Sequence, residues 1–219
     1  DYDCKSIAFT YNDPVIFLEY AIDTAQEAHK LGIKTVAVTA GYINQEARKN
    51  LFEHIDAANV DLKSFSEKFY RKNCLASLEP VLETLKYIKQ KTNVWLEITT
   101  LLIEGENDSD EEIKKECEWI KNNLGTNTPI HFSAFHPSYK FKNYPRTNSK
   151  TLLKACDIAL KTGLNYVYTG NIQNIETSST YCKNCKNIII KRNGFMVEEF
   201  HLDNDGKCIF CKTQCNGDF

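Results

Sequence analysis

The chain has 219 residues, with 27 basic and 29 acidic side chains and a formal net charge of -2. This length allows one sizeable domain and a small second module. The charge lacks the basic excess of a nucleic-acid-binding protein, and no apolar run is long enough to span a bilayer, so neither nucleic acid nor membrane is an expected partner. Four of the nine cysteines fall in two CxxC pairs and most others are scattered singly, which favours a reducing, cytoplasmic setting over a secreted disulfide protein.

The first 170 residues alternate between strand-like and helix-like segments. The predicted strands are rich in Val, Ile, Phe and Thr and mostly apolar on both faces, as is typical of parallel strands covered on each side. The predicted strands are 6–11, 34–40, 57–63, 94–102, 130–136 and 165–170, and the predicted helices are 15–30, 45–54, 78–91, 108–123 and 149–161. This alternation predicts right-handed βαβ units in an α/β fold, either a doubly wound sheet or a barrel, complete or partial.

Two CxxC pairs near the end of the chain carry the strongest chemical signal. The first pair is Cys182 and Cys185, the second is Cys208 and Cys211, and 22 residues separate them. Between them, Asn193-Gly194 stands between apolar runs, which predicts a hairpin turn. Two CxxC turns around a hairpin are the pattern of a zinc ribbon, in which four thiolates form a closed tetrahedral site. We therefore expect a barrel domain at 1–171, a polar linker at 172–180 and a zinc-ribbon module at 181–219.

In parallel α/β folds, functional side chains gather at the carboxyl ends of the strands. In the third predicted strand Asn59, Asp61 and Lys63 follow one another at a spacing of two, so they share one face. Polar groups on a strand covered on both sides need a reason, and in a barrel they would point into the lumen. The alternative is a buried Asp–Lys pair that serves only packing.

Other strand ends supply further candidates, each with a plainer alternative. Asn12 and Asp13 follow the first strand, where Asp13 could simply cap the next helix. Thr39 and Gly41 end the second strand, where glycine allows a ligand to approach the backbone but also suits an ordinary turn. His136 ends the fifth strand before a proline, a position that favours a functional role over a core histidine.

Taken in order, these segments resemble the radical S-adenosylmethionine enzymes. The resemblance is greatest to the branch called the AmmeMemoRadiSam system radical enzyme, which is similar to pyruvate formate-lyase activating enzymes. No single motif is decisive, but the ordered set covers nearly the whole chain. The segments are Tyr-Asn-Asp-Pro at 11–14, Thr-Ala-Gly-Tyr at 39–42, Asn-Val-Asp-Leu-Lys at 59–63, Thr-Thr-Leu-Leu-Ile at 99–103, Phe-His-Pro at 135–137, Tyr-Val-Tyr-Thr-Gly-Asn at 166–171 and the CxxC pairs.

This resemblance implies a partial (β/α)6 TIM-like barrel, with its first βα unit missing, that binds S-adenosylmethionine across the strand ends. It places Asn12 and Asp13 near the methionyl amino group, and Thr39 and Gly41 on the neighbouring loop. It places Asp61 and Lys63 at the ribose and carboxylate, and His136 at the nucleoside. Asp13 departs from the family's usual Glu and Ala40 from its common Asn, and both changes could weaken cofactor binding. The resemblance does not identify which residues are catalytic.

The resemblance also implies a four-iron cluster, an electron donor and a substrate that is either a protein or a small molecule. In the family the cluster is held by CxxxCxxC after the first strand, and this chain contains no CxxxCxxC. The chain begins with Asp rather than Met. We therefore expect the cluster ligands to lie outside these residues, and the chain alone to be unable to cleave S-adenosylmethionine to a 5′-deoxyadenosyl radical.

Two other functions remain open at this point. Lys63 beside Asp61 at a strand end would also suit a Schiff-base lyase or aldolase. A third reading is non-enzymatic, with a degenerate barrel whose zinc ribbon binds a partner.

Overall fold

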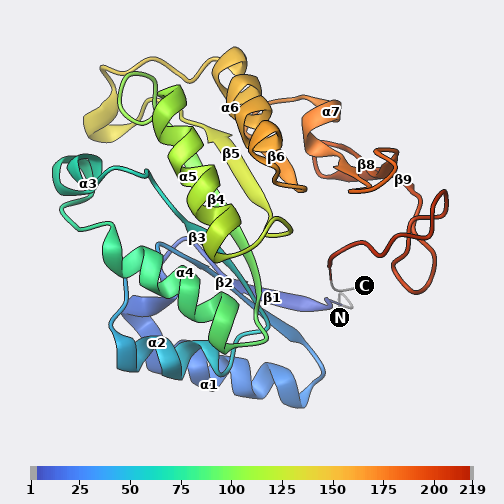
Figure 1. Ribbon diagram of the computed structural model, residues 1–219. Coiled ribbons are helices and arrows are strands. Elements are labelled where there is room, and N and C mark those ends of the chain that lie inside the picture. The colour runs from blue at the N-terminus through green and yellow to red at the C-terminus, as the bar shows by residue number, and fades with distance from the viewer. Residues whose placement is uncertain (1–3, 218–219) are drawn as a thin grey trace. The chain divides into compact units, whose positions relative to one another are not determined.

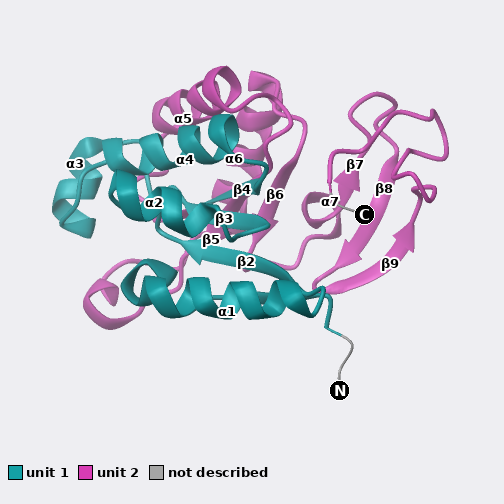
Figure 2. Ribbon diagram, turned by 90° about the horizontal axis from the view of Figure 1, so that it is seen from below, with its two compact units in different colours: residues 1–99 teal, residues 100–219 magenta. Residues whose placement is uncertain are grey.

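The computed structural model describes residues 4–217 and has an α/β fold (Figure 1). Six strands form one parallel sheet in the chain order β1-β2-β3-β4-β5-β6, and three later strands form a small separate sheet, β7-β8-β9. The chain divides into two compact units after Thr99 (Figure 2). The α/β fold and the parallel sheet that the sequence predicts are confirmed. Within residues 4–217, none of the helices has the length and apolar character that a membrane span requires.

The first unit contains the sheet's first strands and the helices between them. Its strands are β1 (Ser6–Phe9), β2 (Lys34–Thr39), β3 (Ala57–Asp61) and β4 (Trp95–Leu102), which continues into the second unit, and its helices are α1 (Leu18–Lys30), α2 (Gln45–Phe52), α3 (Glu67–Phe69) and α4 (Glu79–Lys91). The helix predicted over 15–30 begins as a 3-10 helix at Pro14–Phe17 before α1. Helix α2 starts where predicted because the Asn44 side chain accepts a hydrogen bond from the Ala47 N–H, 2.9 Å away.

The two faces of β3 differ sharply in burial. Ala58, Val60 and Leu62 are at most 2% exposed, while Asn59 and Asp61 on the other face are half-buried. Because successive side chains of a strand point to opposite faces, the apolar set packs under the helices and the polar set faces away from them. The polar alternation in the sequence is therefore a real, accessible face of the first unit.

The second unit completes the large sheet and adds the small one. It contains β5 (Ile130–Ala134) and β6 (Val167–Gly170), with helices α5 (Asp110–Asn123), α6 (Ser149–Thr162) and α7 (Ile175–Ser178), followed by β7 (Thr180–Tyr181), β8 (Ile188–Asn193) and β9 (Met196–Phe200). Helix α7 lies inside the segment predicted to be a linker, where Asn174 caps it.

The predicted hairpin is present, but its turn lies one residue further along the chain. Asn193 pairs with Met196, so the two-residue loop is Gly194-Phe195 rather than Asn193-Gly194. Gly194 has φ +59°, whereas Phe195 is not left-handed. A left-handed glycine at the first loop position suits a type II′ turn, whose twist matches that of the flanking strands. The turn prediction was therefore right in kind and wrong by one residue.

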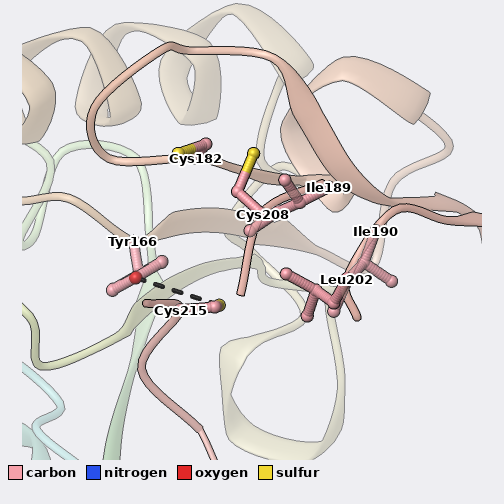
Figure 3. Close-up of a cluster of buried hydrophobic side chains, with 7 residues drawn as sticks. All are labelled: Tyr166, Cys182, Ile189, Ile190, Leu202, Cys208 and Cys215. Atoms are coloured by element: carbon pink, nitrogen blue, oxygen red, sulfur yellow. Dashed lines mark hydrogen bonds between the residues drawn. The ribbon is translucent and has the colours of Figure 1, made fainter. Parts of the chain in front are cut away.

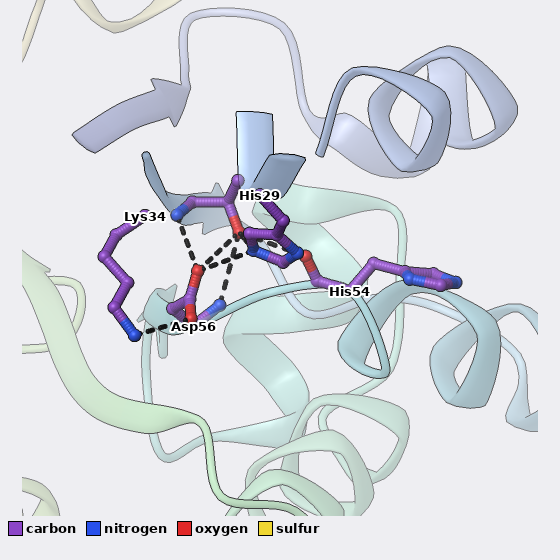
Figure 4. A network of polar contacts seen from close by, with 5 residues as sticks. His29, Lys34, His54 and Asp56 are labelled. Carbon is purple, nitrogen blue, oxygen red and sulfur yellow. Dashed lines mark hydrogen bonds and ion pairs between the residues drawn. The ribbon is translucent and has the colours of Figure 1, made fainter. Parts of the chain in front are cut away.

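A polar network ties α1 to the starts of β2 and β3 (Figure 4). The Asp56 carboxylate accepts a hydrogen bond from the Thr35 N–H at 2.8 Å, and it lies 2.8 Å from His29 Nε2 and 3.2 Å from Lys34 Nζ. Burial by itself would raise the pKa of Asp56, but the contacts with Thr35, His29 and Lys34 outweigh it and lower the pKa from 3.8 to about 2. The network lies at the amino ends of the strands, the end of parallel sheets associated with stability rather than catalysis.

The substitution Asp56→Asn is expected to lower the free energy of unfolding by about 2 kcal/mol at neutral pH. The folded-state pKa is depressed, so the stabilisation is complete above the unfolded pKa near 3.8 and is lost as the pH falls toward 2. Urea titrations at pH 7, 4 and 3 should therefore show wild type and variant converging on acidification. Asp157→Asn, which breaks only the exposed pair with Lys161, is the control and should change stability little. A difference that stays constant with pH would contradict this assignment.

Candidate functional site

The four cysteines of the CxxC pairs converge on one point. Their sulfur atoms all lie within 4.8 Å of one another, with Cys182 Sγ 3.5 Å from Cys211 Sγ and Cys185 Sγ 3.7 Å from Cys208 Sγ. Zinc–sulfur bonds of about 2.3 Å in a tetrahedron place neighbouring sulfurs about 3.8 Å apart. The group can therefore hold a single metal ion, as the spacing in the sequence predicts.

The surroundings change the pKa of two of the four thiols, in opposite directions. Hydrogen bonding with Thr213, through its side chain first and its backbone second, lowers the pKa of the Cys211 thiol well below its usual value. Burial has the opposite effect on Cys208 and raises the pKa of its thiol. Asn187 Nδ2 donates to Cys185 Sγ at 3.5 Å. A bound metal ion would deprotonate all four thiols despite these different pKa values, because thiols coordinate as thiolates.

The apolar core beside the metal group links the ribbon to the large sheet (Figure 3). Ile189 and Leu202 are buried there, together with Cys182 and Cys208. Tyr166, just before β6, belongs to this core, and its hydroxyl accepts a hydrogen bond from the Asn216 N–H at 3.2 Å. A fifth thiol, that of Cys215, lies 3.9 Å from the same hydroxyl but is not one of the four convergent cysteines.

On the polar face of the first unit, Asp61 and Lys63 form an ion pair. Lys63 Nζ lies 2.8 Å from Asp61 Oδ2. The Lys63 side chain is 40% exposed and the Asp61 side chain is 35% exposed. Glu97 is the β4 neighbour of Asn59, and Thr99 is the β4 neighbour of Asp61. The face therefore presents Asp61 and Lys63 at the carboxyl end of β3, beside Thr99 in the middle of β4, with Asn59 and Glu97 further back along the two strands, a set suited to a small polar ligand.

Asp13 ties the loop after β1 to the end of β2. Its Oδ1 accepts hydrogen bonds from the Thr39 hydroxyl at 2.8 Å and the Val15 N–H at 3.1 Å, and its Oδ2 accepts one from the Ala40 N–H at 2.8 Å. The helix-cap alternative is thus correct, but the carboxylate also joins two strand ends. Thr39 is 3% exposed, and its hydroxyl in turn accepts from the Gly41 N–H at 3.0 Å. Both side chains shape the loops here.

Gly41 is required by its conformation and by space. It has φ +65°, and a Cβ built on it would lie 2.8 Å from the Val60 side chain. Any other residue would be strained and would push against the fully buried Val60. Beside this position Thr39 pairs with Val60, so Ala40 and Asp61 follow side by side on neighbouring strands. The loop carrying Asn12, which is exposed, belongs to the same group of strand ends.

One element at this end of the sheet escaped the sequence analysis. Helix α3 runs into a π-helical turn, Tyr70–Cys74, which ends at Leu75 in the left-handed region. Tyr70 is 2% exposed, and its hydroxyl accepts a hydrogen bond from the Lys63 N–H at 3.1 Å. Such π-helical turns occur often at functional sites. An isolated tyrosine in a polar stretch carries no periodic signal, so only the three-dimensional structure identifies Tyr70 as the support of Lys63.

In the second unit, polar residues fix the loops after β4 and β5. The Asn107 side chain is buried; it accepts from the Ile103 N–H at 2.7 Å and donates to the Leu101 carbonyl at 2.9 Å. Thr147, also buried, exchanges hydrogen bonds with the backbone of Phe135. His136, the next residue, is exposed. The histidine therefore lies two residues beyond the end of β5, on a loop that these hydrogen bonds hold in place.

Part of the Thr-Thr-Leu-Leu-Ile segment is structural. Thr100 is 1% exposed, and its hydroxyl lies 2.5 Å from the Glu116 carboxylate of α5. Burial raises the pKa of Glu116 to about 8, against the lowering effect of the Thr100 contact. Glu116 is therefore a neutral, buried acid at pH 7 that hydrogen-bonds within the unit and does not face a ligand.

Comparisons with known proteins identify what the chain is similar to. A family model of the Radical SAM superfamily matches residues 1–117. The uncharacterized protein MJ0808 of Methanocaldococcus jannaschii is 40% identical over 211 residues, which cover 96% of this chain and 62% of that protein. The 4-hydroxyphenylacetate decarboxylase activating enzyme of Clostridium scatologenes is 25% identical over 118 residues, which cover 53% of this chain and 38% of that enzyme.

A solved structure agrees with these sequence matches. A domain of pyruvate-formate lyase-activating enzyme from Bacteroides vulgatus has a TM-score of 0.65 to this chain at 19% identity, covering 75% of this chain and 98% of that domain. At this identity the likeness shows the fold alone. The chain spans about three fifths of MJ0808 and less of the activating enzyme. The family match extends over more than half of the chain, and the chain therefore belongs to the radical SAM superfamily.

Proposed function

We propose that this protein binds S-adenosylmethionine on the polar face of the first unit and takes part in its reductive cleavage. The observation that carries the proposal is the Asp61–Lys63 pair, which stands accessible at the carboxyl end of β3 inside the segment matched by the family. Carboxylate and ammonium groups side by side can bind the hydroxyl groups and the carboxylate of one ligand together. The chemistry that S-adenosylmethionine and a reduced four-iron cluster supply is formation of a radical that abstracts hydrogen from a substrate.

Each site residue has a role that follows from its chemistry. Asp61 would accept hydrogen bonds from the ribose hydroxyls, and Lys63 would pair with the ligand carboxylate. Asp13 is occupied by three donors of this chain, so it would act by holding the loops around Asn12 and Thr39 in place. Gly41 would support the site indirectly, because its left-handed conformation and close packing against Val60 fix the loop after β2.

For the ribbon we propose zinc as the bound metal. The four sulfurs stand at separations that suit one tetrahedral ion. A four-iron cluster places four iron atoms and four sulfides among its thiolates, so it would hold the cysteine sulfurs further apart. Thiolates alone, closed around one point, are the usual ligand set of a structural zinc site.

We further propose that the ligands of the four-iron cluster lie outside residues 1–219. The sequence contains no CxxxCxxC, and Cys182, Cys185, Cys208 and Cys211 are the only metal-ligand group of this kind within residues 4–217. Reconstituted anaerobically with iron and sulfide and given dithionite, the 219-residue chain is expected to release no 5′-deoxyadenosine. Release of that product above the level of a chain lacking the four ribbon cysteines would refute this part of the proposal.

For the substrate we propose a protein rather than a small molecule. Relatives of this chain are named activating enzymes of an enzyme, 4-hydroxyphenylacetate decarboxylase, so their printed target is itself a protein. An electron donor would be a second partner, because reductive cleavage consumes an electron.

Isothermal titration of the purified chain with S-adenosylmethionine tests the proposed site. We expect saturable binding that Asp61→Asn weakens, and much weaker binding of methionine alone, because it lacks the ribose. The variant Glu27→Gln, which alters an exposed pair with Lys30, is the matched control and should bind as wild type does. An absence of binding to the wild-type chain would contradict the proposed site.

The Schiff-base alternative is tested with the same protein. A lysine attacks a carbonyl as a free amine, whereas Lys63 Nζ is held in an ion pair, 2.8 Å from Asp61 Oδ2. We therefore expect no adduct on Lys63 after incubation with pyruvate and borohydride. A mass increase located on Lys63 would favour the lyase reading instead.

A further inference from the structure

The chain is anchored on both sides of Lys63. Lys63 lies two residues beyond the end of β3, between Leu62, which is fully buried, and Ser64, which is 1% exposed. Its own side chain is 40% exposed. The backbone here therefore belongs to the interior of the first unit, while the ammonium reaches out to Asp61.

The backbone of Lys63 is also fixed by Tyr70. Lys63 lies outside the residues of β3 that pair with β4, and its N–H donates to the Tyr70 hydroxyl at 3.1 Å. Tyr70 is 2% exposed, so the acceptor comes from the interior of the unit. Backbone N–H groups inside a protein need an acceptor, and here a side chain takes the place of a neighbouring strand.

Tyr70 is itself held by its backbone and by its ring. Its N–H donates to the Ser66 carbonyl at 3.1 Å. Its carbonyl accepts from the Leu75 N–H, and from the Ala76 N–H at 3.2 Å. Its ring packs edge-to-face against Phe69, with 6.5 Å between the ring centroids. The hydroxyl that holds Lys63 is therefore carried by a side chain with little freedom to move.

The segment that carries this ring has two locally unfavourable features. It forms the π-helical turn Tyr70–Cys74, and it ends at Leu75 with φ +53°. Both are uncommon, and such outliers gather at functional sites. Glu67 helps to keep the segment closed, because its carboxylate accepts from the Leu78 N–H at 2.8 Å and from Arg71 Nε at 2.7 Å.

The end of the same turn lies near the Lys63 ammonium. Burial raises the pKa of the Cys74 thiol, and the charge of Lys63 partly offsets this rise. On its other side the ammonium lies 2.8 Å from Asp61 Oδ2. The turn therefore borders Lys63 at its backbone N–H and near its charged end.

We propose that Tyr70 is a positioning residue for ligand binding, whose hydroxyl sets the Lys63 ammonium beside Asp61 before any ligand arrives. Groups that already stand in their binding geometry lose less freedom when the ligand binds. Tyr70 is buried, so its effect passes through Lys63 and concerns only the ligand group that Lys63 binds. The inference rests on the proposed function, in which that group is the carboxylate of S-adenosylmethionine.

Isothermal titration with two ligands tests this role. Tyr70→Phe removes one oxygen and keeps the ring, and we expect it to weaken S-adenosylmethionine binding about fivefold, as for the loss of one hydrogen bond. The second ligand, 5′-methylthioadenosine, keeps the nucleoside but has no carboxylate, so Tyr70→Phe should leave its affinity unchanged. Retained binding of this ligand also shows that the variant is folded.

A double-mutant cycle shows whether Tyr70 acts through Lys63. In a Lys63→Met background, Tyr70→Phe should weaken S-adenosylmethionine binding no further, because both substitutions then affect the same ammonium. Additive losses of affinity would contradict the proposed role.

The matched control is Tyr166→Phe. Tyr166 is 3% exposed in the second unit, and its hydroxyl also accepts a backbone N–H, that of Asn216 at 3.2 Å. This substitution should lower stability as Tyr70→Phe does and should leave the affinity for both ligands unchanged. If Tyr70 served stability alone, Tyr70→Phe would weaken both ligands equally.

Amide hydrogen exchange, followed by NMR without ligand, tests the support of Lys63 directly. The Lys63 amide should exchange slowly in wild type and faster in Tyr70→Phe, because its acceptor is lost. Fast exchange in wild type would overturn the inference, as would equal affinity of wild type and Tyr70→Phe for S-adenosylmethionine; in the second case the cofactor site stands. If wild type binds no S-adenosylmethionine while its Lys63 amide exchanges slowly, the proposed function falls and the support of Lys63 by Tyr70 stands.

Discussion

Cys208→Ser is expected to abolish tight metal binding and to unfold the ribbon, the largest effect of any single substitution considered for this protein. Cys208 is fully buried among Ile189, Leu202 and Cys182, so a bound metal ion and the local core would depend on the same side chain. Structural zinc contributes about 10–16 kcal/mol to small modules, far more than a ribbon of this size gains from its apolar core. We expect about one zinc per chain in wild type and none in the variant by elemental analysis.

The matched control for this prediction is Cys215→Ala. Cys215 is a buried cysteine of the same core, but it lies outside the group of four convergent thiols. Its removal should lower stability by the cost of a small cavity, about 1–2 kcal/mol, and should leave the metal content unchanged. In both variants the helices of the large sheet should persist in circular dichroism, because they do not depend on the metal. Freshly purified wild type without metal, or equal metal loss in both variants, would contradict the assignment.

Lys63→Met is expected to weaken S-adenosylmethionine binding about tenfold while changing stability by less than about 1 kcal/mol. Lys63 and Asp61 are 40% and 35% exposed, and ion pairs exposed to this degree contribute little to folding. Binding loses the attraction of an ammonium for the ligand carboxylate, about 1.4 kcal/mol for a tenfold change. A melting curve beside a binding titration measures both quantities on the same sample.

The opposite result would show that the Asp61–Lys63 ion pair serves stability and not ligand binding. If Lys63→Met lowers the melting temperature strongly and leaves affinity unchanged, then Asp61 depends on Lys63 as an internal counter-charge. Lys63→Arg keeps the charge and serves as the control, with affinity closer to wild type than that of Lys63→Met. A second control is Lys161→Met, whose pair with Asp157 is exposed and lies on α6.

Local sequence patterns determined the elements, the face of β3 and the metal group. Period-two alternation placed Asp61 and Lys63 on one face because a strand turns each successive side chain to the opposite side. The Asn44 cap and the start of α2 were also predictable, because capping involves residues three apart. The two CxxC pairs identified four thiols that converge and could hold one metal ion, because each turn already brings two sulfurs together.

Only the tertiary structure decided which distant groups meet. Asp13 accepts hydrogen bonds from Thr39 and Ala40, which lie 26 and 27 positions away in the sequence. This contact follows from the pairing of β1 with β2 and has no local signature. The same holds for Tyr70, whose hydroxyl accepts a hydrogen bond from the Lys63 N–H. Sequence spacing determines local structure, such as helix caps and the faces of a strand. Long-range contacts and the exposure of each side chain depend instead on how all residues of the chain pack together.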